Sequence, residues 1–202
     1  MSEGVLVLFQ LVILIFSVIV HEVMHGLVAY WLGDTTAKDA GRLTLNPLAH
    51  IDPFGSVLLP LGLYMLSGGG FVLGWARPVP YNPMNLSNPR RGGGLIALSG
   101  PASNLVLAII AALLLRTPFA GVVIQPVLLQ ITIAINLGLM VFNLVPIPPL
   151  DGSKVLFSLL PGRFSRFELA AERYGWWLII LFVLFGFELI IPIVNGLYRL
   201  LV

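Results

Sequence analysis

Residues 4–32 contain the sequence GVLVLFQLVILIFSVIVHEVMHGLVAYWL. From Gly4 to Val20 no residue is charged, and Gln10 and Ser17 are the only clearly polar side chains. About 20 predominantly apolar residues are enough for a helix to cross the hydrocarbon core of a bilayer. The stretch therefore predicts a transmembrane helix over residues 5–32.

The second half of this helix carries the pattern His21-Glu22-Val23-Met24-His25. Residues i and i+4 lie on one face of a helix, so His21 and His25 can bind the same cation, and neutral imidazole suits Zn²⁺. Glu22 is rotated by about a quarter turn, which places its carboxylate beside the metal as a general base for zinc-bound water. A chance match is the competing interpretation, but ionisable groups inside lipid are costly, and this cost favours the metal site.

The composition indicates an integral membrane protein. The chain has 202 residues, of which 58% are hydrophobic and 10% are charged, and its mean hydropathy is +0.98. Soluble domains carry about 25% charged residues. The net charge of +2 comes from scattered basic residues and gives no indication of nucleic-acid binding. The absence of cysteine excludes disulfides and cysteine-ligated metals.

The apolar runs predict an all-α polytopic membrane protein. Four runs are long enough for full transmembrane helices: 5–32, 95–115, 122–145 and 174–201. We expect a single membrane-embedded domain over residues 1–202, with its core in residues 4–155. Residues 156–202 are expected to add an interfacial segment and the last transmembrane helix, in which Pro192 is a candidate kink.

Two shorter regions are expected to be irregular. The apolar run 54–66 is too short for a comfortable span and is predicted to be a short or re-entrant segment. Residues 71–93 are dense in Pro, Gly and Asn, which disfavour helix. Segments 41–55 and 71–83 are predicted to supply a small β-hairpin or edge strand near the active site, where an unwound substrate could pair with it.

The basic residues predict the orientation. With the N-terminus outside, four full spans place nine Lys and Arg residues on one side and leave Arg116 and Arg199 on the other. The nine are Lys38, Arg42, Arg77, Arg90, Arg91, Lys154, Arg163, Arg166 and Arg173. Cytoplasmic loops carry the excess of basic residues, so the side with nine basic residues is predicted to be cytoplasmic. His21 and His25 then lie in the cytoplasmic half of the first span.

A third metal ligand is expected where the third run ends. Residues 143–152 contain the sequence NLVPIPPLDG, in which three prolines within four residues cannot continue a helix. Asp151 is therefore expected on irregular backbone at the depth of the two histidines, where it could complete a His₂Asp set and leave a fourth position for water. A simple turn at a helix end is the alternative interpretation.

These paired motifs resemble those of the site-2 protease family of intramembrane zinc metalloproteases, in its short bacterial-type branch without PDZ or CBS domains. The resemblance also covers connecting motifs in the same order, over about residues 18–155. The connecting motifs are GRLTLNPLAHIDPFG at 41–55, GWARPVP at 74–80 and SGPASN at 99–104. Ser153 departs from the pattern, because many members of the family have a second glycine there.

The resemblance implies an intramembrane zinc metalloendopeptidase. It implies one Zn²⁺ on His21, His25 and Asp151, with Glu22 activating water, although the ligand set would also accept Co²⁺ or Fe²⁺. It implies a bacterial or archaeal cytoplasmic membrane and substrates that are transmembrane segments of proteins such as anti-sigma factors or membrane-tethered regulators. Two other classes stay open: a metal transporter or sensor, and a catalytically silent protein that binds transmembrane segments.

Three further polar residues each have two possible roles. By resemblance, Asn104 and Asn143 are candidates for binding substrate or the tetrahedral intermediate. The alternatives are a bond between helices for Asn104 and a cap on the unwound helix end for Asn143. A ligand role for His50 would close the metal to water, so we expect it to be structural.

Overall fold

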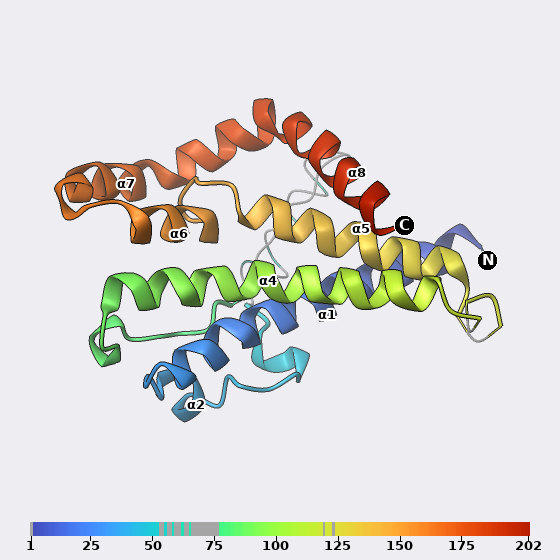
Figure 1. The fold of residues 1–202 in the computed structure, drawn as a ribbon, viewed down its shortest axis with the longest axis horizontal. Helices are drawn as coiled ribbons and strands as arrows, with labels where there is room; N and C mark the ends of the chain where they lie inside the picture. The colour runs from blue at the N-terminus through green and yellow to red at the C-terminus, as the bar shows by residue number, and fades with distance from the viewer. Residues whose placement is uncertain are drawn as a thin grey trace.

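The computed structural model describes residues 2–52, 77–118, 120–122 and 124–202, together with Gly55, Leu58, Gly62 and Met65. The described part is a bundle of helices in which α1, α4 and α5 pack against one another and α8 packs on α5 (Figure 1). The helices are α1 (Glu3–Trp31), α2 (Thr36–Asp39), α4 (Pro89–Leu115), α5 (Pro126–Asn143), α6 (Asp151–Leu159), α7 (Ser165–Leu181) and α8 (Ile190–Leu201). Short 3-10 turns, among them η1 (Pro47–Ala49), η3 (Pro83–Asn85) and η4 (Gly162–Phe164), join them.

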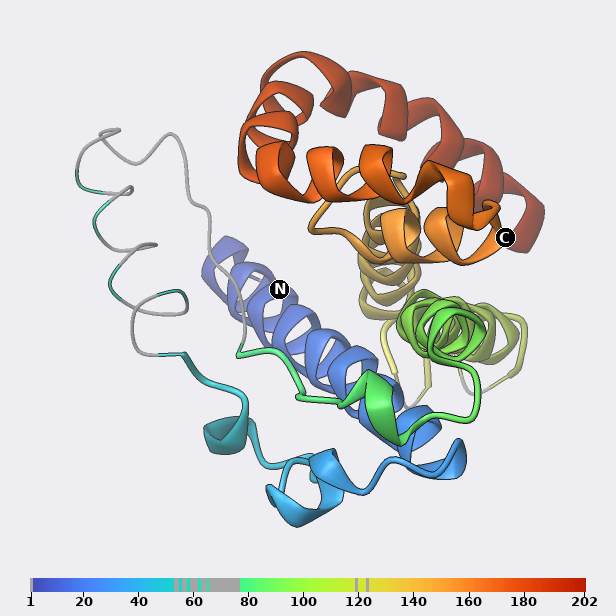
Figure 2. The same cartoon turned by 90° about the vertical axis from the view of Figure 1, so that its left-hand side faces the viewer.

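The long helices run between two ends of the molecule. Both termini lie at one end, and α2, α6 and the starts of α4 and α7 lie at the other (Figure 1), which is the end that faces the viewer in Figure 2. This second end carries Lys38 on α2, Arg90 and Arg91 on α4, and Lys154 on α6. The asymmetry of basic residues expected from the sequence is therefore present in the arrangement of the helices.

Four helical stretches of the described chain are long and apolar enough to cross a membrane: Glu3–Trp31, Pro89–Leu115, Pro126–Asn143 and Gly162–Gly186. The first three confirm the predicted runs. The second begins at Pro89, six residues earlier than expected. The prediction of irregular structure over residues 71–93 was therefore wrong for residues 89–93. The Asn88 side chain accepts the Arg91 N–H and Pro89 occupies the first helical position, so a helix starts there despite three glycines.

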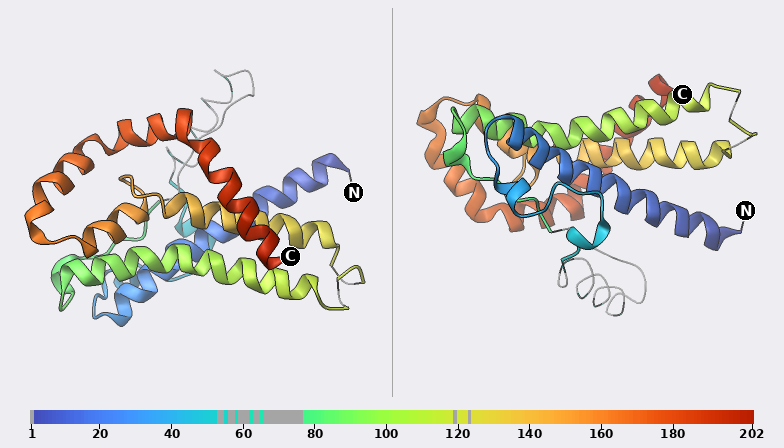
Figure 3. Two further views of the ribbon diagram at one scale, coloured as in Figure 1. Left: turned by 45° about the horizontal axis from the view of Figure 1, so that its top comes forward. Right: turned by 90° about the horizontal axis from the view of Figure 1, so that it is seen from below.

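The last apolar run differs from the prediction of one helix over 174–201. A π-helical turn, Phe182–Gly186, and a 3-10 turn, Phe187–Leu189, separate α7 from α8, and the two helices form an arch (Figure 3). Pro192 lies in the first turn of α8, where its missing N–H costs no helical hydrogen bond. The break therefore precedes the proline instead of falling on it.

The expected β-hairpin or edge strand is not supported. The described residues 41–52 and 77–83 contain turns, 3-10 turns and coil, and the one isolated bridge in the described chain joins Ala120 and Ile124. Pro78, Pro80 and Pro83 remove N–H groups that a strand would need. Residues 71–76 lie outside the described residues. So does the predicted re-entrant segment 54–66, apart from four single positions.

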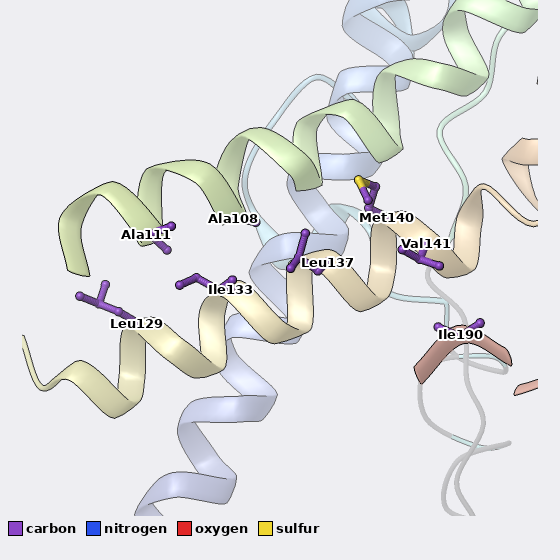
Figure 4. Close-up of a cluster of buried hydrophobic side chains, with 9 residues drawn as sticks. Ala108, Ala111, Leu129, Ile133, Leu137, Met140, Val141 and Ile190 are labelled. Atoms are coloured by element: carbon purple, nitrogen blue, oxygen red, sulfur yellow. The ribbon is translucent and has the colours of Figure 1, made fainter. Parts of the chain in front are cut away.

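Small residues allow α4 to approach α5 closely. Ala108, Ala111 and Ala112 of α4 meet Leu129, Ile133 and Leu137 of α5, and Ile190 of α8 joins the same buried cluster (Figure 4). In lipid there is little hydrophobic gain from bringing helices together, so close packing of small against large side chains supplies much of the attraction. This contact fixes α5, and with it the segment that leads to Asp151.

Asp34, just after α1, anchors the segment of residues 77–82. Its buried carboxylate accepts the Asn82 N–H at 2.7 Å, the Asn85 amide at 2.7 Å, and both the N–H and the hydroxyl of Thr36. Burial alone would raise the pKa of Asp34. The hydrogen bonds lower the pKa by a larger amount, so the net shift is downward. The ionised carboxylate thus holds the segment against the end of α1.

We predict that Asp34→Ala lowers the free energy of unfolding by about 2 kcal/mol, because several charge-assisted hydrogen bonds are lost. The contribution should be complete above the unfolded-state pKa of about 3.9 and disappear as pH falls through the lower folded-state value. Thermal unfolding in detergent between pH 3 and 7 measures both effects. The control is Asp39→Ala, whose exposed carboxylate accepts one bond from Thr35, and equal losses for the two variants would contradict the anchor.

Candidate metal centre

Three side chains from two helices converge at one point. His21 and His25 face the same side of α1, and their rings meet edge to face with centroids 4.6 Å apart. Asp151 Oδ2 lies 3.0 Å from His21 Nε2 and 3.2 Å from His25 Nε2. The structure therefore brings together the three residues that the sequence proposed as ligands.

The position of Asp151 differs in one respect from the prediction of irregular backbone. It is the first residue of α6, with Leu150 as N-cap, and a carboxylate is stabilised at a helix N-terminus. Burial alone would raise the pKa of the Asp151 carboxyl. Its interactions with the imidazoles of His21 and His25 lower the pKa by a larger amount, so it lies well below its usual range. Asp151 is therefore ionised at neutral pH.

The outer nitrogen of each histidine is already engaged. His21 Nδ1–H donates to Asn104 Oδ1 at 2.7 Å, and His25 Nδ1–H donates to the Ile96 carbonyl at 2.7 Å. A neutral imidazole has only one N–H, so an Nε2 atom contacts the Asp151 carboxylate favourably only when it carries a proton of its own or shares a cation with the carboxylate. A metal ion among the three atoms meets this requirement for both histidines at once.

The spacing suits zinc. Ligand atoms about 2.0–2.1 Å from a tetrahedral zinc lie about 3.3 Å from one another, close to the two distances found here. Histidines that bind metal usually donate their other N–H to an oxygen, which fixes the tautomer.

Potential ligand atoms of His21, Glu22 and His25 lie within 4.8 Å of one another. Glu22 Oε2 accepts the Val79 N–H at 2.9 Å, so its carboxylate is held beside the point of convergence.

A pocket of about 170 Å³ opens at the three ligands. It lies between α1, α4, α6 and the 77–82 segment, and Glu22, Tyr81, Asn143 and Lys154 line it. Ala97 also lines it, and Pro101, four residues later in α4, leaves the Ala97 carbonyl without its usual helical donor. The pocket thus has charged and polar side chains, Glu22, Asn143 and Lys154, in its lining although it lies between apolar helices.

The two candidate asparagines occupy different places. Asn104 is fully buried, and its amide donates to Asn136 Oδ1 at 3.0 Å while its oxygen accepts from His21. Asn136 in turn donates to the Thr132 carbonyl. Asn143 lines the pocket and donates to the Leu139 carbonyl. Asn143 is therefore the one placed where a substrate could reach it.

His50 lies away from the ligands. Its ring is buried, Nε2–H donates to the Thr44 carbonyl at 2.8 Å, and its own carbonyl accepts the Arg77 N–H. These bonds hold the turn over residues 44–50 to the 77–82 segment. The placement agrees with the structural role expected from the sequence.

Several residues of the site were missed by sequence reasoning. A Cβ at Gly100 would lie 2.5 Å from His21 Nε2 and 2.5 Å from His25 Cε1, so only glycine fits there. The SGPASN motif at 99–104 contains this glycine, but nothing in the motif indicated which residues it faces. Buried Arg42 was also missed, and its Nη2 donates to the Arg77 carbonyl at 2.6 Å. Long-range contacts of this kind carry no local sequence signal.

The fold and the site together define a class: a multi-pass membrane protein with a metallopeptidase-type His-Glu-His centre. The sequence model of peptidase family M50 matches residues 9–126 and 116–187. The chain belongs to this family, that of the site-2 proteases, and is a zinc metalloprotease of the site-2 type.

The relatives are consistent with the family. "Putative zinc metalloprotease YwhC" of Bacillus subtilis (strain 168) is 40% identical over 200 residues, which cover 93% of this chain and 86% of that protein. "Putative zinc metalloprotease Rip2" of Mycolicibacterium smegmatis is 32% identical over 175 residues, covering 83% of this chain and 63% of the relative. The Rip2 of Mycobacterium tuberculosis (strain H37Rv) is 33% identical over 183 residues, covering 89% and 66%. No solved structure matches this chain.

We predict that Gly100→Ala abolishes stoichiometric zinc binding, because the added methyl group would displace both imidazoles. Metal content of the purified protein, measured by mass spectrometry, tests this. The control is Gly138→Ala in α5, where a Cβ would meet nothing within 4 Å, and it should retain zinc. A Gly100→Ala protein with wild-type zinc content would show that the histidine positions are not those described.

Proposed function

We propose that this protein hydrolyses peptide bonds within or next to transmembrane segments of other membrane proteins, using one zinc ion per chain. His21, His25 and Asp151 are the proposed ligands, and Glu22 is the proposed general base. Family membership supports peptide hydrolysis. The observation that carries the ligand assignment is the convergence of two imidazole nitrogens on one buried carboxylate oxygen.

Zinc, when bound, supplies a Lewis acid that polarises the scissile carbonyl and makes water more acidic. The Glu22 carboxylate takes a proton from the attacking water and passes it to the amide nitrogen that leaves. The Val79 N–H holds Glu22 Oε2, which leaves the other carboxylate oxygen for this transfer. The pocket at the site is lined by polar as well as apolar residues, among them Lys154, which is exposed, so water would reach the site through it and not through lipid.

The two asparagines receive different roles in this proposal. Asn143 lines the pocket and would bind the substrate backbone or the oxyanion that forms at the scissile carbonyl. Asn104 touches His21 and is closed off from the pocket by its burial. We assign it the role of a positioning residue, which fixes the tautomer and the ring orientation of His21.

The proposed location is a bacterial or archaeal cytoplasmic membrane, with the N-terminus outside. The basic residues gathered at the end with α2 and α6 support a cytoplasmic position for that end. The site lies toward the same end, so substrates would be cut on their cytoplasmic side. Anti-sigma factors and membrane-tethered regulators are substrates of the kind that we propose.

A transporter and a silent binding protein are the competing functions. Along a transport path several carboxylates would be expected, whereas Glu22 and Asp151 are the only acidic residues among those lining the pocket. A protein that only binds transmembrane segments has no need of a base beside the metal. Glu22 therefore separates the three functions.

We predict that Glu22→Gln lowers cleavage by at least about 100-fold, because the proton acceptor is lost while the ligands stay in place. The assay is co-expression with a panel of transmembrane-segment substrates, with products identified by mass. The matched control is Glu172→Gln on the exposed face of α7, which should cleave as wild type does. Cleavage that survives Glu22→Gln would exclude Glu22 as the base, and zinc content of the variant shows whether the site remained loaded.

We further predict that Asn104→Leu weakens zinc binding about 10- to 100-fold, because His21 Nδ1–H loses its acceptor. Asn104→Asp keeps an oxygen that accepts from His21 but loses the donor to Asn136 Oδ1, so it should bind zinc less tightly than wild type and more tightly than the leucine variant. Competition with a chelator of known affinity measures both values. If the leucine variant binds zinc as tightly as wild type, Asn104 does not position His21.

A further inference from the structure

Lys154 stands at the pocket that holds the three ligands. It follows Asp151 by three residues in α6, so the two side chains lie on neighbouring positions of one helix face. Its side chain is exposed, and Nζ lies 6.0 Å from the centroid of the Tyr81 ring. Tyr81 belongs to the 77–82 segment, and both residues line the pocket. Lys154 and Tyr81 thus meet across its mouth from two different elements.

The charges around the pocket are unevenly distributed. Among the described residues that line it, Lys154 is the only Lys or Arg, and Glu22 and Asp151 are the acids. Asp151 is engaged by His21 and His25, and Glu22 by the Val79 N–H. Within the described part of the chain, Lys154 takes part in none of the ion pairs found. Its ammonium group is therefore available to a group that enters from outside.

We propose that Lys154 selects substrates by the charge of the residues that flank the cleaved bond on the α6 side. It attracts a segment that carries Asp or Glu there and repels one that carries Lys or Arg. This inference rests on the proposed function, since it concerns what the same pocket accepts.

Such selection would discriminate strongly among membrane proteins. Most transmembrane segments carry Lys or Arg at their cytoplasmic end, and the α6 end of this protein carries the basic residues too. A lysine at the pocket would thus repel the majority of transmembrane segments, which have basic flanks, and attract the minority with acidic flanks. Because the pair would be partly exposed, attraction and repulsion should each change the rate about three- to fivefold.

A charge-reversal experiment tests the proposal. Three substrates differ at one flanking position, which is Glu, Gln or Lys, and each is cleaved in membranes by wild type, Lys154→Glu and Arg91→Glu. Arg91 is an exposed residue at the start of α4, at the same end of the molecule, and does not line the pocket. Both variants change the net charge by the same amount, so a general effect of charge appears in both.

Wild type should cleave the Glu substrate about tenfold faster than the Lys substrate. Lys154→Glu should reverse this order, and Arg91→Glu should leave the ratio within about twofold of wild type. An unchanged ratio in Lys154→Glu, or an equal loss on all three substrates, would overturn the proposal and leave Lys154 a structural role. If wild type and Glu22→Gln leave all three substrates equally uncut, the proposed function itself fails, and the inference fails with it.

Discussion

The convergence of two imidazole nitrogens on one carboxylate oxygen is the interaction on which the site depends. Asp151 Oδ2 lies 3.0 Å from His21 Nε2 and 3.2 Å from His25 Nε2, and the Nδ1 atoms of both rings are engaged elsewhere. Inside an apolar bundle the electrostatic energy of such a contact is large. In the proposed function a zinc ion makes ligands of the same three atoms, and its binding would then stabilise the folded arrangement. The remaining helices can be understood as the means of holding these three side chains in place.

The hydrogen bonds behind His21 run in one direction through the centre of the bundle. The imidazole donates to Asn104, Asn104 donates to Asn136, and Asn136 donates to the Thr132 carbonyl of α5. Each amide accepts through its oxygen on the His21 side and donates through its nitrogen on the other, so a single orientation satisfies the whole series. In a medium without water, an unpaired member would cost several kcal/mol. The packing of α4 on α5 therefore also favours the ring orientation in which His21 Nε2 faces Asp151.

The sequence pointed to the residues that the structure brings together, because each lies in a local pattern with chemical meaning. His21, Glu22 and His25 share one helix face, and Asp151 follows a run of prolines that must end a helix. Predictions failed where tertiary contacts or capping decide. The Asn88 cap extends α4 over a glycine run, and Asp151 opens α6 instead of lying on irregular backbone. The fit of Gly100 against two imidazoles and the approach of Lys154 to Tyr81 join residues more than 70 positions apart, and no local pattern encodes them.

The 77–82 segment, which lines the pocket, is bonded to Glu22, the proposed base. Asp34 holds residues 82 and 85, Arg42 holds the carbonyls of residues 77 and 78, and the Val79 N–H between them binds Glu22. A movement of this segment would therefore move the donor that orients the Glu22 carboxylate. A general base works only within hydrogen-bonding reach of the proton it takes. In the proposed mechanism, the segment that lines the pocket would thus also decide whether Glu22 is aligned, and the Val79 N–H would couple substrate entry to the activation of water.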